Sequence, residues 1–191
     1  MRFDDGSQLR LYRQTVEDFG LFAGRELSVE EFRKLKENAG ATSAKMRAVR
    51  ILATTGVSKK DLEQRLIRKG ETPDHARNAV EWMEDLSLID DRKTAEQIVQ
   101  RCIGKGYGMA RAKQALFEKR IPKEYWQEVL ADYPDQTDSI ISYLRTQLSD
   151  ANDPKQLRKV MDALLRRGHS YAQIRKGLEQ LCVDMDEFPE G

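Results

Sequence analysis

The 191 residues carry 33 basic and 32 acidic side chains, and 39% of them are apolar. This composition excludes a disordered chain, because the apolar residues recur at regular spacing, and it suits one or two folded domains. No apolar run approaches the roughly 18 residues of a membrane-spanning helix. The polar amino terminus MRFDDGSQLR lacks the apolar stretch of a signal peptide. We therefore expect a cytoplasmic protein without membrane contact.

The charge is unevenly distributed along the chain. Residues 44–181 carry 26 basic and 20 acidic side chains, a net charge of +6, whereas residues 182–191 carry four acidic side chains and no basic one. A moderately basic body suits a nucleic acid or a nucleoprotein surface as its partner. A well-solvated helical surface would explain the same composition.

The amino-terminal stretch predicts a short β-hairpin followed by a short helix. Asp5-Gly6 is a turn dipeptide that stands between Phe3 and the alternating sequence LRLYR. The short helix is expected over Thr15–Leu21, before the next glycines.

A second helix of this extension is expected over Val29–Asn38. Ser28 followed by Glu31 has the spacing of a capping box, in which each residue satisfies a backbone N–H of the other. The sequence Ala39–Ser43 is rich in small residues and predicts a flexible joint.

From Ala44 onward the apolar spacing predicts helices only. The expected helices run from about Ala44 to Gly56, Ser58 to Gly70, Pro73 to Leu86, Asp91 to Ile103, Gly108 to Arg120, Pro122 to Tyr133, Thr137 to Leu148, Pro154 to Gly168, and Ser170 to Leu181. Two of the expected inward stripes are Met46, Val49, Leu52 and Ala53, and Ala76, Val80, Met83 and Leu86.

Three stretches share one pattern: TTGVSKKDLEQRLIRKG (54–70), GKGYGMARAKQALFEKR (104–120) and RRGHSYAQIRKGLEQLC (166–182). The second copy is offset by 50 residues from the first, and the third by 62 residues from the second. In one register the coinciding positions are Gly56, Gly106 and Gly168; Leu62, Ala112 and Ile174; and Leu66, Leu116 and Leu178.

Self-similarity of this kind is typical of repeat proteins. We expect a mainly α-helical fold: an elongated, curved array of three tandem three-helix repeats over residues 44–90, 91–134 and 135–183. A small β-hairpin and helix extension (1–43) precedes the array, and an acidic tail (184–191) follows it.

No catalytic, metal or cofactor site is expected. The sequence GKGYG at 104–108 follows a helix, not a strand, and lacks the third glycine of a dinucleotide-binding loop. His75 and His169 are far apart, have no ligand cluster with zinc spacing, and are expected at the surface. Cys102 lies on an apolar stripe and is expected in the core, and Cys182 stands alone.

The basic residues are the candidate binding residues, because they recur at similar places in the repeated hairpin and could follow a polymer backbone. The candidates are Arg65, Lys69, Lys105, Arg111, Lys113, Lys119, Arg166, Arg167, Arg175 and Lys176. Lys and Arg that only coat the outer sides of amphipathic helices would give the same pattern.

Gly-Val-Ser at 56–58 resembles the turn of a DNA-reading helix-turn-helix, in which the second helix enters the major groove. A DNA-binding helix-turn-helix regulator is therefore the alternative function. The threefold occurrence of the pattern argues against it, because most of these helices must pack on neighbours.

Three stretches resemble the RecX family: RAVRILA (47–53), LSLIDDRKTAEQIVQRCIGKGYGMARAKQALFEKRIP (86–122) and LLRRGHSYAQIRKGLEQL (164–181). The resemblance covers residues 44–181, and the first 43 residues look like the extension of many members. Glu71-Thr72-Pro73 departs from the pattern, since members often have an apolar residue there.

The resemblance implies a monomer that lies in the groove of the RecA recombinase filament on single-stranded DNA, with weak nonspecific DNA binding at most. It implies inhibition of the ATPase, strand-exchange and co-protease activities of RecA, by a protein that is not an enzyme and needs no cofactor. The basic character carried over is that of Lys105, Arg111, Lys113, Arg166, Arg167 and Arg175.

Overall fold

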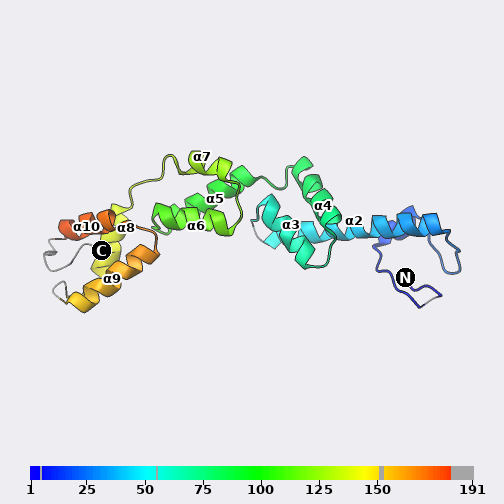
Figure 1. The fold of residues 1–191 in the computed structure, drawn as a ribbon, viewed down its shortest axis with the longest axis horizontal. Coiled ribbons are helices and arrows are strands. Elements are labelled where there is room, and N and C mark those ends of the chain that lie inside the picture. Colours follow the sequence, from blue (N-terminus) through cyan, green and yellow to red (C-terminus); the bar gives the residue numbers. More distant parts are fainter. Residues whose placement is uncertain (5, 55, 151–152, 182–191) are drawn as a thin grey trace. The chain divides into compact units, whose positions relative to one another are not determined.

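The computed structural model describes residues 1–4, 6–54, 56–150 and 153–181. Asp5, Cys182 and the acidic tail expected over 184–191 lie outside the described residues. The described part is mainly α-helical, as expected, and divides into two compact units, Met1–Asp90 and a second that begins at Asp91 (Figure 1). The finer division into an extension, three repeats and a tail stays a prediction.

The first unit is built on one long helix. Its helices are α1 (Arg13–Asp18), α2 (Val29–Thr54), α3 (Lys59–Arg68) and α4 (Pro73–Asp85). The second half of α2 packs with α3 and α4 around one apolar cluster that includes Leu62, Leu66 and Met83, all fully buried.

The second unit contains two groups of helices, each around its own apolar cluster. The first group is α5 (Asp91–Gly104), α6 (Met109–Glu118), the 3-10 turn η1 (Lys123–Tyr125) and α7 (Trp126–Leu130). The second group is α8 (Thr137–Gln147), α9 (Pro154–Arg166) and α10 (Tyr171–Gln180). The helix expected over Pro122–Tyr133 is therefore shorter and begins as a 3-10 turn.

The amino-terminal hairpin is not confirmed. An isolated antiparallel bridge joins Arg2 to Gln8, and the amide of Gly6 donates to the carbonyl of Phe3 at 3.0 Å. The chain thus turns where expected, but no strand forms within the described residues.

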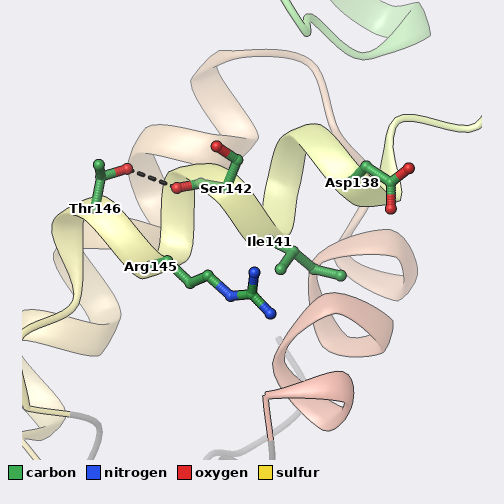
Figure 2. A pocket seen from close by; sticks show the side chains of 5 residues that line it. All are labelled: Asp138, Ile141, Ser142, Arg145 and Thr146. Carbon is green, nitrogen blue, oxygen red and sulfur yellow. Dashed lines mark hydrogen bonds between the residues drawn. The ribbon is translucent and has the colours of Figure 1, made fainter.

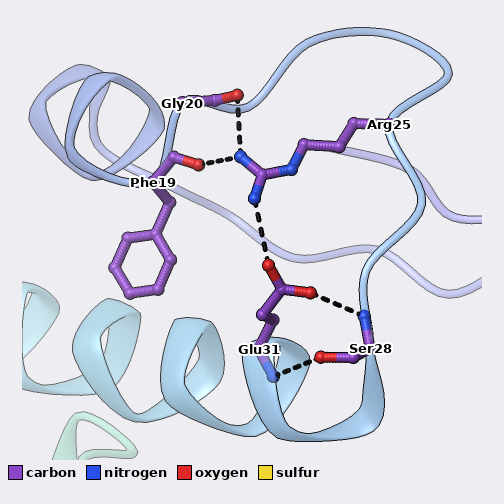
Figure 3. Close-up of polar contacts among 5 residues, drawn as sticks. All are labelled: Phe19, Gly20, Arg25, Ser28 and Glu31. Carbon is purple, nitrogen blue, oxygen red and sulfur yellow. Dashed lines mark hydrogen bonds and ion pairs between the residues drawn. The ribbon is translucent and has the colours of Figure 1, made fainter.

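The capping box at the start of α2 is confirmed (Figure 3). The Ser28 amide donates to the Glu31 carboxylate at 2.8 Å, and the Glu31 amide donates to the Ser28 hydroxyl at 3.2 Å. Arg25 pairs with the same carboxylate at 3.1 Å and also donates to the carbonyl oxygens of Phe19 and Gly20. The hydrogen bonds from Ser28, followed by the contact with Arg25, hold the pKa of Glu31 below its usual value. This cluster joins the end of α1 to the start of α2.

The flexible joint expected over residues 39–43 is wrong, because α2 continues through it without a break. Gly40 serves close packing there: a Cβ at this position would lie 2.2 Å from the His75 ring. His75 is therefore largely covered, with 11% of its side chain exposed, and its Nε2 lies 2.9 Å from the Glu37 carboxylate. The expected surface position of His75 is also wrong.

The inward stripe expected on this part of α2 has the wrong register. Met46 and Val49 are about 40% exposed (40% and 41%), whereas Ala44 and Ala48 are fully buried. Small side chains face α4 because its own contact face is also small, with Ala76 and Ala79 in the same apolar cluster. On α4 itself the expected stripe is correct except at its end, where Leu86 is 49% exposed.

The apolar register shared by the three similar stretches is confirmed by burial. Its members are all 0% exposed: Leu62, Ala112, Ile174, Leu66, Leu116 and Leu178. The hydrogen bonds that close the preceding or same helices repeat with the same offsets, as the amides of Glu71 and Ile121 bond the carbonyls of Leu66 and Leu116, and those of Tyr107 and His169 bond the carbonyls of Cys102 and Leu164. These observations favour the repeat interpretation, which stays a prediction.

Replacing Ala41 by proline tests the continuity of α2. Proline inside a helix removes a hydrogen bond and clashes with the preceding turn, so Ala41→Pro should lower the free energy of unfolding by about 3 kcal/mol. Ala41→Ser, which changes only helix propensity, should cost about 0.5 kcal/mol. Chemical denaturation of both variants gives the comparison, and equal stability would restore the flexible joint.

Candidate binding surface at two docked turns

Two turns of the second unit, residues 105–108 between α5 and α6 and residues 167–170 between α9 and α10, lie against each other. The Gly108 amide donates to the Arg167 carbonyl at 3.0 Å, and the Ala110 amide donates to the Gly168 carbonyl at 3.3 Å. The His169 ring nitrogen Nε2 lies 3.1 Å from the Gly106 carbonyl. We call this contact the turn junction.

The turn junction requires glycine on both sides. A Cβ on Gly108 would lie 2.0 Å from the Gly168 carbonyl oxygen, and a Cβ on Gly168 would lie 2.3 Å from the Arg111 amide nitrogen. Gly168 also has a φ of +88°, which side chains other than glycine rarely adopt. The recurring glycines thus allow two backbones to approach, in addition to ending helices.

His169 is buried in the turn junction, with 4% of its surface exposed, so its expected surface position is wrong. A carbonyl can only accept, so Nε2 carries the hydrogen and Nδ1 is the bare nitrogen of a neutral ring. Nδ1 is buried and has no hydrogen-bond partner among the described residues. Burial lowers the pKa of His169, the bond to Gly106 opposes this shift, and the nearby Arg167 charge adds to it.

Two cations and two tyrosines stand beside the turn junction. The Arg167 guanidinium carbon lies 4.4 Å from the centre of the Tyr143 ring and 5.9 Å from that of Tyr107. The Lys105 ammonium lies 6.0 Å from the Tyr107 ring centre. The Tyr133 hydroxyl donates to the Tyr107 carbonyl at 2.7 Å, and burial raises the pKa of Tyr133 to about 12. These contacts fix the two cations close together.

An open pocket of about 430 Å³ lies between these cations and helix α8. Its lining is Gly104, Lys105, Gly106, Asp138, Ser139, Ser142, Tyr143, Thr146 and Arg167. A neighbouring pocket shares Asp138, Ser142 and Thr146, and there the Thr146 hydroxyl donates to the Ser142 carbonyl at 2.6 Å (Figure 2). The outer face of α8 is therefore lined by small hydroxyl side chains.

The structure brings together some of the ten predicted cations. Lys105, Arg111 and Arg167 adjoin the turn junction, and Arg111 also pairs with Glu118 at 3.1 Å. Arg166 is exposed at the end of α9, and Lys113 is exposed on α6. No hydrogen bond or ion pair within the described part of the chain engages the side chains of Lys105, Lys113, Arg166 or Arg167.

The other predicted cations lie elsewhere. Arg65 and Lys69 belong to α3 in the first unit, where Arg65 pairs with Asp61 at 2.9 Å. On α10, Arg175 pairs with Glu179 at 3.1 Å and Lys176 with Asp135 at 3.3 Å. Lys119 caps the end of α6. Their charges are in part balanced locally.

Tyr107 and Tyr143 were missed in the sequence. Tyr107 stands two residues after Lys105, and this interleaving of an aromatic with a cation could have indicated it. Tyr143 lies 36 residues further along the chain, and only the packing of α8 brings it under Arg167.

No group of three or more His, Cys, Asp and Glu side chains that could hold a metal ion occurs among the residues that the structure covers. Among the same residues, none of the helices has the length and apolarity to cross a membrane.

No family model matches the sequence. A regulatory protein RecX from Xanthomonas axonopodis pv. citri is 30% identical over 132 residues, which cover 68% of this chain and 82% of that protein. The chain belongs to the RecX family. A regulatory protein RecX from Streptococcus gordonii is 24% identical over 191 residues, covering 98% of this chain and 74% of that protein.

Two crystal structures of RecX proteins share the fold. One, titled as a regulatory protein RecX, has a TM-score of 0.67 at 18% identity and covers 92% of this chain and 91% of its own. The other, RecX from Lactobacillus salivarius, has a TM-score of 0.62 at 21% identity, with 76% and 98% coverage. The helical architecture is therefore that of RecX proteins.

Replacing Gly108 by alanine tests the turn junction. The new methyl group meets backbone that cannot move aside, so Gly108→Ala should lower the free energy of unfolding by about 1–3 kcal/mol. Gly104→Ala is the matched control, because nothing lies within 4 Å of a Cβ there. Since alanine favours a helix, this control should be neutral or stabilising by up to about 1 kcal/mol. Equal effects in thermal melts would show that the turns do not dock closely.

Acid should weaken the turn junction through His169. Its pKa is lower in the folded chain than its usual value of about 6.5, so the unfolded chain binds the proton more tightly. Stability is therefore complete above about pH 6.5 and falls as the pH drops through the folded pKa, by at most about 1.4 kcal/mol per pH unit. His169→Gln cannot titrate and should lack this component between pH 7 and 5. Parallel pH profiles of the two proteins would contradict the assignment.

Proposed function

We propose that this chain binds the RecA recombinase filament on single-stranded DNA and inhibits its ATPase, strand-exchange and co-protease activities without catalysing a reaction. The observation that carries the proposal is the group of unpaired cations at the turn junction, Lys105, Lys113, Arg166 and Arg167, in a chain of the RecX family. The filament is a nucleoprotein, and its DNA supplies the negative charge that such cations bind.

The turn junction makes this basic surface suitable for binding. Backbone hydrogen bonds and close glycine packing hold the two turns, so the cations beside them need little ordering when a partner binds. We propose further that the three apolar clusters are those of three tandem three-helix repeats forming one extended contact surface, in a cytoplasmic monomer.

The burial of the helix starts argues against the helix-turn-helix alternative. A recognition helix reads base edges with its amino-terminal residues. At the start of α3, Ser58 is 0% and Asp61 is 5% exposed. The starts of α6 and α10 meet each other at the turn junction, through Gly108 and His169. These helix starts are covered by protein, so we do not propose sequence-specific reading of DNA.

Charge reversal at exposed positions tests the proposed function. Lys113→Glu combined with Arg166→Glu should weaken inhibition of the RecA ATPase, while each change costs no more than about 0.5 kcal/mol of stability, as is usual at surfaces. The measurement is a titration of inhibition at several salt concentrations, with thermal melts beside it.

The matched control is Lys159→Glu, an exposed lysine on α9 about 10 Å along the helix from Arg166. It should inhibit like the unchanged protein. If the double variant also inhibits normally at every salt concentration, these cations are only a solvated helix surface. Failure of the unchanged protein to inhibit RecA would overturn the proposed function itself.

A further inference from the structure

Arg167 is held in place without an acceptor for its hydrogen-bond donors. Its backbone amide and carbonyl are fixed by the end of α9 and by Gly108, and its guanidinium rests on the Tyr143 ring at 4.4 Å. A half-buried arginine usually satisfies its donors with a carboxylate or a carbonyl. Within the described residues no acceptor engages the five N–H donors of this guanidinium.

Lys105 presents a second positive charge to the same pocket. Its ammonium lies 6.0 Å from the Tyr107 ring, which the Arg167 guanidinium also approaches at 5.9 Å. The facing wall, from α8, carries the hydroxyl groups of Ser139 and Ser142. One carboxylate, Asp138, also lines the pocket, but no ion pair joins it to either cation in the described chain. The pocket therefore has a net positive charge and unsatisfied donors.

The glycines of the rim let an extended ligand pass close to the cations. Gly104 and Gly106 line one side of the pocket without side chains, and Arg101 lies one helical turn before Lys105 on α5. Arg101 is exposed, as is Arg166 next to Arg167. Cations therefore continue beyond the pocket on both sides, which suits a polymer of regularly spaced negative charges.

We propose that this pocket binds a backbone phosphate of a single nucleic-acid strand, with the Arg167 guanidinium and the Lys105 ammonium as its ligands. The proposal rests on the proposed function and assigns these two cations to the DNA of the filament, not to its protein. An arginine fork takes two phosphate oxygens, and a lysine adds a point charge.

Tyr143 and Tyr107 act as positioning residues in this site. Their rings hold the guanidinium in one plane, and the opposite face of a guanidinium plane is a surface on which an unpaired base can stack. A cation row beside a stacking surface is the combination that binds single strands without sequence preference. Carboxylates of an acidic protein surface would use the charges but not the stacking surface.

The test measures binding of the full chain, without RecA, to a fluorescent dT15 oligonucleotide between 50 and 200 mM salt. Each phosphate contact on a single strand contributes about 0.7 to the slope of log affinity against log salt. Lys105→Gln should therefore reduce the slope by about 0.7, and Lys105→Gln with Arg167→Gln by about 1.4. Lys159→Gln, away from the pocket, should leave the slope unchanged.

Changes at Tyr143 separate positioning from charge. Tyr143→Phe keeps the ring and should bind like the unchanged protein, whereas Tyr143→Leu should bind about two- to fivefold more weakly as the cation–π contact is lost. Arg167→Lys keeps the charge and should preserve most of the slope but lose affinity, because the fork is gone. Thermal melts identify any variant that unfolds, and the exposed Lys105→Gln remains decisive in that event.

Two outcomes would overturn the proposal. One is a slope that does not change in Lys105→Gln. The other is polyglutamate that binds the chain as tightly as dT15 and loses affinity equally in the variants, which would assign the pocket to carboxylates of a protein. Since RecA is absent, either result can occur while inhibition of RecA persists, so failure of the site and failure of the proposed function are distinguishable.

Discussion

The contact between Gly108 and Gly168 is the constraint on which the second unit depends. Neither residue has room for a Cβ, and three hydrogen bonds cross the interface where they meet. The contact joins the group of α5, α6 and α7 to the group of α8, α9 and α10, whose apolar clusters are otherwise separate. It also sets the position of Arg167, because the Arg167 carbonyl accepts one of these bonds.

The first unit uses small residues in the same way. Gly40 lets α2 approach the His75 ring, and the alanine face of α2 packs on the alanine face of α4. Where a charge is buried in this unit, it is paired: the Glu71 carboxylate, with 7% of its side chain exposed, bonds Arg47 and Ser43 at 2.9 and 2.8 Å. A buried carboxylate without such partners would be strongly destabilising.

The contrast between paired and unpaired cations gives the surface its functional meaning. Many basic residues of this chain balance a nearby acid, such as Arg65 on α3 or Lys176 on α10. Beside the turn junction the opposite holds, since Lys105 and Arg167 contact aromatic rings and have no acid partner among the described residues. A fold that fixes cations in this way lowers the entropic cost of binding an anion.

The sequence by itself determined the helices, their capping and the shared apolar register, because these follow from local spacing that any helix obeys. Leu62, Ala112 and Ile174 are buried as predicted, and the Ser28–Glu31 capping box forms. The motifs also identified the family, and the recurring basic residues included the two cations of the pocket.

Only the tertiary structure decided which glycines mark flexibility and which mark close approach. Gly40 suggested a joint, but it lies inside a continuous helix because the His75 ring occupies the space that a side chain would need. His169 and Tyr143 became informative only when their surroundings were known. Burial and ring stacking arise between residues that are distant in sequence, so no local pattern of spacing encodes them.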